Sequence, residues 1–143
     1  MALLSADLLA LVSSRHSGGL AVLKRDGRPQ LSTVSYRWYP GESLVRVSTV
    51  DGRAKVANLR RDPRASLYVT SPNGWSYAVL EGEAQLSDVA SAPDDAVVDE
   101  LVQLYRDISG EHPDWDEYRQ AMVEDRRLVA RLHVTRAYGL HQG

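Results

Sequence analysis

Close turns divide the first two thirds of this 143-residue chain and leave short apolar stretches between them. The turn sequences are Asp26-Gly27, Pro40-Gly41, Asp51-Gly52 and Ser71-Pro72-Asn73-Gly74. Asp-Gly between β-branched, alternating runs is the strongest local signal for a hairpin, because these residues tolerate the positive φ of tight turns. Short strands joined in this way predict an antiparallel sheet that forms a barrel or a sandwich.

Alternation of apolar and polar residues sets the bounds of the expected strands. They are predicted at residues 20–24, 30–39, 44–50, 65–70, 75–86 and 128–134. The long run at 75–86 contains Gly82, which predicts a break or bulge there. On the strand at 44–50, Val47 and Thr49 fall on one face and Ser48 on the other.

Helices are expected beside the strands. The first begins at Ser5, a good cap residue, and is predicted to end at Ser17-Gly18-Gly19. The others are predicted at residues 53–61, 94–109 and 115–125. The expected fold class is therefore mainly β with α, with about six or seven antiparallel strands and flanking helices in one domain over residues 1–143.

The composition argues against several classes of function. The chain has no cysteine, and its four histidines lack the spaced partners of a metal site. No apolar run is long enough to span a bilayer and no secretion signal is visible, so a cytoplasmic protein without membrane partners is expected. Residues 81–117 contain twelve acids and one base, Arg106, a balance that would repel nucleic acid.

The segment 44–66 has the opposite charge to the chain as a whole. It contains six basic residues and two acids, a net of +4, in a protein of formal net charge −2. Arg53 and Lys55 fall at the expected helix start, where free backbone N–H groups favour an anion and where acids are usual. These two residues predict a phosphate site. A solvated basic face explains the remaining helix-end arginines equally well, namely Arg60, Arg61 and Arg64.

The chain shows no catalytic side-chain pattern of its own, which leaves chemistry by a bound cofactor. Nucleophile-elbow, Walker and dinucleotide glycine motifs are all missing from the sequence. Small polar residues and aromatic rings near the basic segment suit a phosphorylated ring system, whose edge would bond to polar groups and whose face would be covered by apolar ones. The polar set is Gln30, Ser32, Ser48 and Thr49, and the aromatic set is Trp38, Trp75 and Tyr77. Trp75 is equally expected as a core residue.

Five segments of the chain together resemble a known family. They are GRPQLSTVSY, LVRVST, GRAKVANLRRDPRASL, GWSYAVLEGEAQL and LVQLYRDISGEHPDWDEYRQAMVEDRR, and they cover nearly the whole chain in order. The pattern R-A-K-x-x-N-L-x-R-D-P is quite specific. The chain is similar to the pyridoxamine 5′-phosphate oxidase-like flavin and deazaflavin proteins, most of all to the actinobacterial group that uses coenzyme F420. This resemblance implies an FMN-binding split β-barrel and a homodimer with two cofactor sites at its interface.

The resemblance also implies roles for individual residues. Arg53 and Lys55 would hold the cofactor phosphate, and Asn58 would support their loop. The residues implied to line the ring and the ribityl chain are Gln30, Ser32, Val47, Ser48 and Thr49. Those implied to approach from the partner subunit, or to cap the substrate side, are Trp75, Ser76 and Tyr77. Thr33 stands where this group commonly has Asn, which weakens any hydrogen bond expected at that position.

The main functional hypothesis is an oxidoreductase in which reduced F420 passes a hydride to a small organic acceptor. Two alternatives stay open: an FMN-dependent oxidase or reductase of the same fold, and a non-catalytic F420 carrier. The substrate-phosphate residues of true pyridoxamine phosphate oxidases are not visible near the C-terminus, which makes vitamin B6 oxidation the lesser reading. The sequence assigns no catalytic residue, and solvent and Tyr77 are the candidates for proton donation.

Overall fold

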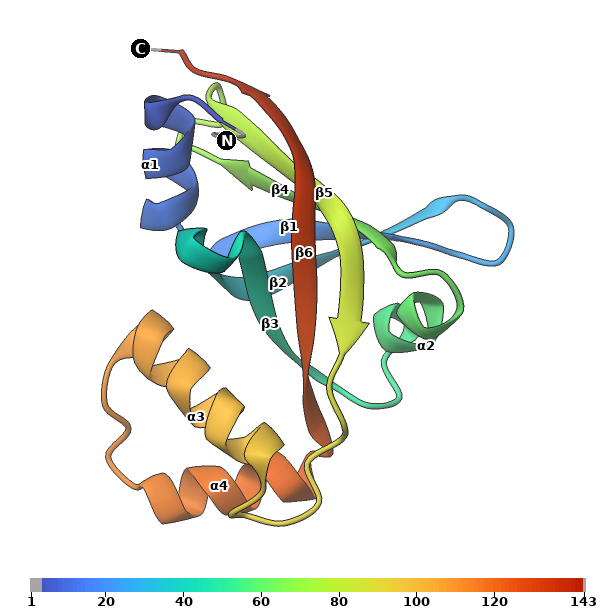
Figure 1. Ribbon diagram of the computed structural model, residues 1–143, viewed down its shortest axis with the longest axis vertical. Helices are drawn as coiled ribbons and strands as arrows, with labels where there is room; N and C mark the ends of the chain where they lie inside the picture. Colours follow the sequence, from blue (N-terminus) through green and yellow to red (C-terminus); the bar gives the residue numbers. More distant parts are fainter. Residues whose placement is uncertain (1–3, 143) are drawn as a thin grey trace.

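The computed structural model describes residues 4–142, and within them six β-strands form a barrel beside four α-helices (Figure 1). In chain order the elements are α1 (Ala6–Ser14), β1 (Ser17–Leu23), β2 (Pro29–Tyr39), a 3-10 turn (Pro40–Glu42), β3 (Leu44–Val50), α2 (Ala54–Arg61), β4 (Arg64–Thr70), β5 (Tyr77–Leu86), α3 (Ala96–Ser109), α4 (Trp115–Glu124) and β6 (Arg127–Leu140).

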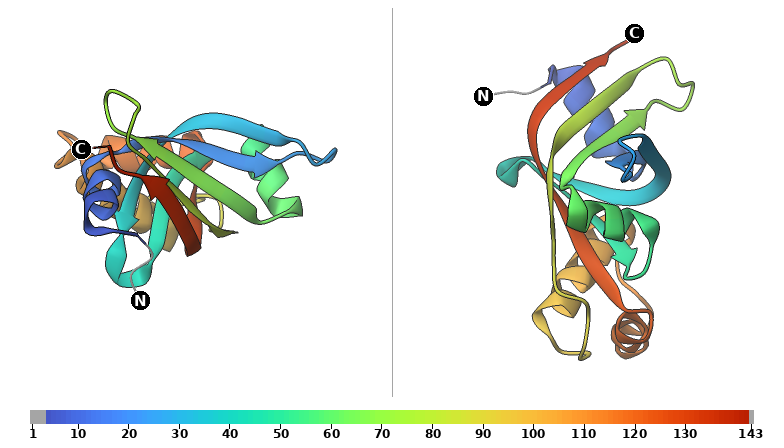
Figure 2. Two further views of the ribbon diagram at one scale, coloured as in Figure 1. Left: turned by 90° about the horizontal axis from the view of Figure 1, so that it is seen from above. Right: turned by 90° about the vertical axis from the view of Figure 1, so that its right-hand side faces the viewer.

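All the strand pairs are antiparallel, and the sheet closes in the order β1-β2-β3-β6-β5-β4. The long strand β6 runs along the molecule (Figures 1 and 2). It lies between β3 and β5 and pairs with both of them. Closure leaves no open sheet edge. The observed barrel with flanking helices confirms the predicted fold class.

The barrel interior is filled by alternate residues of each strand. Val34, Tyr36 and Trp38 point inward from β2, as their spacing predicts. The buried Tyr36 hydroxyl donates a hydrogen bond of 2.6 Å to the carbonyl oxygen of Val12 in α1. This bond and the burial of Leu8 tie the N-terminal helix to the barrel core.

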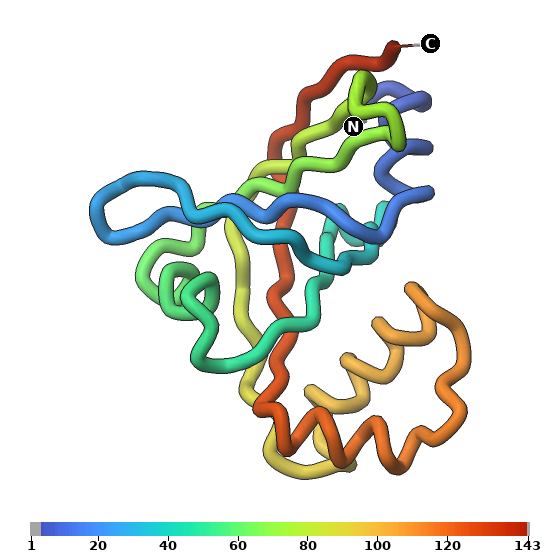
Figure 3. The backbone as a smooth tube through the Cα atoms, turned by 180° about the vertical axis from the view of Figure 1, so that it is seen from behind, coloured from blue at the N-terminus to red at the C-terminus, as the bar shows by residue number. Residues whose placement is uncertain are grey.

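The basic segment folds as the sequence predicts. β3 ends at Val50, and Gly52 takes a positive φ of 94° in the turn that leads to α2. α2 buries Val56 and Leu59 and stops before Pro63, which cannot continue a helix. Figure 3 shows α2 beside the projecting β1–β2 hairpin, on the side of the barrel away from α3 and α4.

The predicted end of the first helix was wrong. α1 ends at Ser14 with Arg15 as its cap residue, and Ser17, Gly18 and Gly19 belong to β1. A Cβ atom on Gly18 would lie 2.9 Å from the carbonyl oxygen of Tyr68 in the neighbouring β4. The glycine therefore allows close contact between two strands. This contact cannot be predicted from the neighbouring residues in the sequence.

Two strand boundaries also differ from the prediction. β5 begins at Tyr77 rather than at residue 75, and β6 continues past residue 134 to Leu140, because its second half pairs with β5. The predicted break near Gly82 is a bulge, where a Cβ atom would overlap the carbonyl oxygen of His133.

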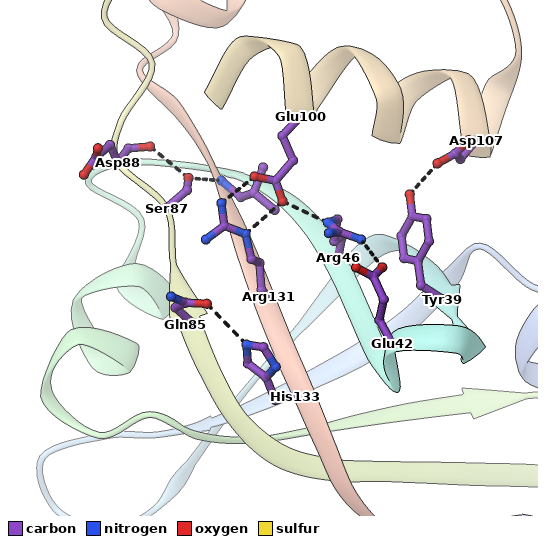
Figure 4. Close-up of polar contacts among 11 residues, drawn as sticks. Tyr39, Glu42, Arg46, Gln85, Ser87, Asp88, Glu100, Asp107, Arg131 and His133 are labelled. Atoms are coloured by element: carbon purple, nitrogen blue, oxygen red, sulfur yellow. Dashed lines mark hydrogen bonds and ion pairs between the residues drawn. The ribbon is translucent and has the colours of Figure 1, made fainter. Parts of the chain in front are cut away.

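α3 and α4 form a separate layer against β6 and β3. A partly buried ion-pair network holds α3 there: Glu100 accepts hydrogen bonds of 2.8 Å from the Nε atoms of both Arg46 and Arg131 (Figure 4). The hydroxyl of Tyr39 donates a further bond of 2.5 Å to Asp107. These contacts fix the position of α3 against β2, β3 and β6.

Candidate functional site

A hollow at the start of α2 gathers the residues that the sequence assigned to a phosphate. We call it the cationic pocket; its volume is about 390 Å³. Its lining comes from β2, β3, the start of α2 and the start of β6: Thr33, Val34, Ser35, Ser48, Thr49, Val50, Arg53, Lys55 and Arg127. Three of these residues are cations and none is an acid, a balance that favours an anionic ligand.

The basic residues of segment 44–66 separate into two groups by their partners. Three arginines pair with acids: Arg46 with Glu42 and Glu100, Arg60 with Asp51, and Arg64 with Asp62. Arg61 donates to the carbonyl oxygen of Leu23 and to Asn58. Within residues 4–142, Arg53 and Lys55 make no ion pair. Of the six basic residues in this segment, Arg53 and Lys55 are therefore the two that line the pocket and have no acid in the described part of the chain to balance their charge.

Lys55 is half-buried, and its electrostatic surroundings are unfavourable in the free protein. Burial first, and then the positive charge of Arg53, lower the pKa of the Lys55 ammonium below its usual value of 10.5. Arg53 is the N-cap of α2 and makes no capping hydrogen bond, so N–H groups of the first turn remain available. A phosphate in this position would offset the repulsion between the cations and accept those N–H groups.

Gln30 and Asn58 lie outside the lining of the cationic pocket. The Asn58 side-chain amide donates a bond of 2.8 Å to Gln30, and its carbonyl oxygen accepts one of 3.0 Å from Arg61. These bonds brace α2 against the β1–β2 hairpin. The support of the phosphate loop by Asn58 stays a prediction, and Gln30 contacts Asn58 rather than the pocket.

The three residues expected from β3 differ in what they offer. Val47 is 2% exposed and its side chain belongs to the barrel core. Ser48 and Thr49 both line the cationic pocket. On β2, Ser32 lines a different hollow on the outer barrel surface, together with Leu31 and Tyr68.

Trp75, Ser76 and Tyr77 stand apart from the cationic pocket of the same chain. The β4–β5 turn that carries the first two lies near α1 and the end of β6 (Figure 1). Ser76 is buried and hydrogen-bonds to the backbone of Gln142, while Trp75 is 70% exposed. The expectation that they act from a partner subunit stays a prediction.

Residues that the sequence did not assign also line the pocket. Ser35 and Thr33 point outward from β2, and their alternation with the core residue Val34 is the signal that could have identified them. Arg127 carries no such signal. It reaches the site because barrel closure pairs it with Val50, which lies 77 positions earlier in the chain.

A second hollow adjoins the first. This aromatic chamber has a volume of about 310 Å³ between the barrel and the α3–α4 pair. Its lining is Ser35, Ser48, Leu101, Leu104, Tyr105, Ile108, Ser109, Tyr118, Met122 and Arg127. Burial raises the pKa of Tyr118 to about 12, so the phenol stays neutral at physiological pH. Three residues line both hollows: Ser35, Ser48 and Arg127.

Membrane-spanning helices and metal-ligand clusters are both absent from residues 4–142. None of the helices there has both the length and the apolar character needed to cross a membrane. The same residues contain no group of three or more histidines and acids placed to hold a metal ion.

Comparison with known proteins gives the chain its family. A family model described as pyridoxamine 5′-phosphate oxidase matches residues 4–141. The F420H(2)-dependent biliverdin reductase of Mycobacterium tuberculosis (strain CDC 1551 / Oshkosh) is 30% identical over 136 residues, which are 95% of this chain and 88% of that relative.

Solved structures share the fold at lower identity. A conserved hypothetical protein of Mycobacterium tuberculosis matches with a TM-score of 0.71 and 21% identity over 100% of this chain and 92% of its own. A protein described as an F420 reductase matches with a TM-score of 0.68 and 20% identity over 94% of this chain and 98% of its own. With the family model spanning nearly every described residue, the chain belongs to the pyridoxamine 5′-phosphate oxidase family.

Proposed function

We propose that this protein is an oxidoreductase that uses reduced coenzyme F420 to reduce a small organic acceptor. The observation that carries the proposal is the cationic pocket, where Arg53 and Lys55 meet without an acid to balance them. A relative that is 30% identical and named an F420H(2)-dependent biliverdin reductase supports the choice of cofactor.

Different residues of the pocket would bind different parts of the cofactor. Arg53 and Lys55, with the first N–H groups of α2, would hold the cofactor phosphate by charge-assisted hydrogen bonds. The hydroxyls of Ser35 and Ser48 lie between the two hollows and would orient the polar edge of the cofactor. When bound, F420 supplies the hydride, and the protein contributes positioning and exclusion of water.

The aromatic chamber is the proposed place for the acceptor. It is next to the cationic pocket and is lined mostly by apolar and aromatic side chains, and its volume of about 310 Å³ is at the lower end of the range for ligand pockets, roughly 300–1,000 Å³. Biliverdin is the first acceptor to try, because the named relative acts on it.

A second copy of the chain would complete the site. Large apolar side chains remain exposed on the strands and on the β4–β5 turn, and exposed apolar patches mark protein contacts. They are Leu31, Tyr68, Trp75, Tyr138 and Leu140, which are between 47% and 73% exposed. We therefore expect a homodimer, and light scattering that showed only a 15.9 kDa monomer at micromolar concentration would contradict it.

Two fluorescence titrations of the purified apoprotein test the cofactor assignment, one with F420 and one with FMN at the same salt concentration. Saturation by F420 at much lower concentration than FMN is the expected result. The reverse order would favour an FMN enzyme, because FMN also offers a ribityl phosphate to the cationic pocket. If neither cofactor bound, the phosphate site itself would be refuted.

A panel of acceptors with the F420-loaded protein then separates enzyme from carrier. Oxidation of reduced F420 that depends on both protein and acceptor is expected. Tight F420 binding without turnover of any acceptor would support the carrier hypothesis instead.

A further inference from the structure

Arg127 lies at the boundary between the cationic pocket and the aromatic chamber and lines both. It is the first residue of β6, and its Nη1 atom is 3.4 Å from the hydroxyl oxygen of Ser48. Its Nε–H is buried and has no hydrogen-bond partner within residues 4–142. A buried donor of a charged group is costly to leave unpaired, so this one is suited to a ligand.

The surroundings of Arg127 contain no acid that would compete for it. None of the residues that line either hollow is Asp or Glu. The nearby carboxylate of Asp51 already pairs with Arg60 and with Arg126. Tyr118, the titratable group that faces Arg127 from α4, is a neutral phenol at physiological pH.

The position of Arg127 differs from that of the two residues proposed to bind the phosphate. Arg53 and Lys55 line only the cationic pocket, whereas Arg127 is the one charged residue in the lining of the aromatic chamber. A guanidinium group presents a planar fork of donors that matches a carboxylate in two-point contact. A cation at the rim of an apolar chamber suits a ligand with an apolar ring part and an attached acid.

We propose that Arg127 selects acceptors that carry a carboxylate, by bonding this group while the apolar part of the acceptor occupies the aromatic chamber. This inference rests on the proposed function, since it assumes that the acceptor enters beside the cofactor. It assigns Arg127 to the acceptor rather than to the cofactor phosphate, and it makes this residue a determinant of specificity.

The test compares biliverdin with its dimethyl ester, which keeps the ring system and lacks the free acids. Quenching of tryptophan fluorescence gives a dissociation constant for each in the protein loaded with oxidised F420, so that no turnover intervenes. The wild-type protein should bind the diacid at least about tenfold more tightly than the ester, as expected for a charge-assisted contact.

Arg127→Gln should abolish this preference while leaving the affinity for the ester within about twofold of wild type, and it should weaken F420 binding far less than Lys55→Ala does. Arg127→Lys keeps the positive charge but lacks the planar guanidinium group, so it should retain part of the preference. The matched control is Arg126→Gln, because Arg126 is adjacent, 64% exposed and outside both hollows. This control should keep the full preference.

Three results would overturn the inference: a preference that survives in Arg127→Gln, failure of the wild type to prefer the diacid, or a loss of F420 affinity in Arg127→Gln as large as in Lys55→Ala. The last result would place Arg127 in the phosphate site. Failure of the wild type to bind F420 at all refutes the proposed function instead, and the separate cofactor titration distinguishes the two cases.

Discussion

Replacing Lys55 by alanine tests whether the cationic pocket binds the phosphate of the cofactor. Lys55 is half-buried, has no acidic partner in residues 4–142, and is repelled by Arg53. A hydrogen bond between charged groups contributes roughly 1.5–3 kcal/mol. Loss of that contact should raise the dissociation constant for F420 about 10- to 150-fold.

In the apoprotein, Lys55→Ala should leave the free energy of unfolding unchanged or raise it slightly. The lowered pKa of Lys55 means that its charged form is less favourable in the folded protein than in the unfolded chain. Removing the ammonium therefore removes a small penalty at neutral pH. A variant with weaker cofactor binding and an undiminished free energy of unfolding would identify Lys55 as a ligand-binding residue.

Fluorescence titration of wild type and variant with F420, combined with urea unfolding, measures both quantities. The matched control is Lys24→Ala, because Lys24 is the only other lysine of the chain and is exposed near the β1–β2 turn. It should leave the affinity unchanged. Equal affinities of Lys55→Ala and wild type would refute the phosphate assignment, and equal losses in both variants would indicate a non-specific effect of net charge.

Three further predictions concern proton binding and the fold. The affinity for F420 should fall as pH rises through the pKa of Lys55, which burial and Arg53 hold below 10.5, and titrations of Lys55→Arg should lack this fall. Glu100→Gln should lower the free energy of unfolding at pH 7, measured in urea, by about 1–3 kcal/mol, whereas the exposed Glu111→Gln should change it by less than about 0.5 kcal/mol. Gly82→Ala should cost about 1–3 kcal/mol by thermal unfolding, and Gly41→Ala, where a Cβ meets open space, should cost far less.

The pH dependence of the Glu100 network has a definite sign. Burial opposes the ionisation of Glu100, but the hydrogen bonds from Arg131 and Arg46 outweigh it and hold its pKa below the usual value. The stabilisation is therefore present above the unfolded pKa of about 4.3 and is lost as pH falls through the lower folded value. Wild type and Glu100→Gln should converge in stability at acid pH; a constant difference down to pH 2 would contradict the network's electrostatic origin.

Much of the secondary structure could be predicted because its causes are local. The hairpin turn around Gly27, the cap at Ser5 and the stop at Pro63 depend on neighbours within a few residues. The residues whose structure was wrongly predicted depend instead on contacts with distant parts of the chain. The sequence predicts a helix end at Gly18, but this residue lies in a strand, where its lack of a side chain lets the carbonyl oxygen of Tyr68 approach closely.

The candidate site shows the same division. Arg53 and Lys55 could be predicted because anion binding at a helix start is a property of one short segment. For Arg60 and Arg64 the sequence left a solvated face as an alternative, and the structure shows that they pair with Asp51 and Asp62. The partner-subunit role of Trp75 is still a prediction, because it depends on a second chain.

The sequence by itself determined the strand and helix pattern, the family resemblance and the cation pair at the start of α2. The tertiary structure decided which cations stay unbalanced, where the aromatic chamber opens, and that Arg127 stands between the two hollows. The physical reason is that hydrogen-bonded turns and caps are set within one segment, whereas pockets and charge balance arise from contacts between distant segments. Barrel closure, which pairs Val50 with Arg127, supplies the contact that completes this site.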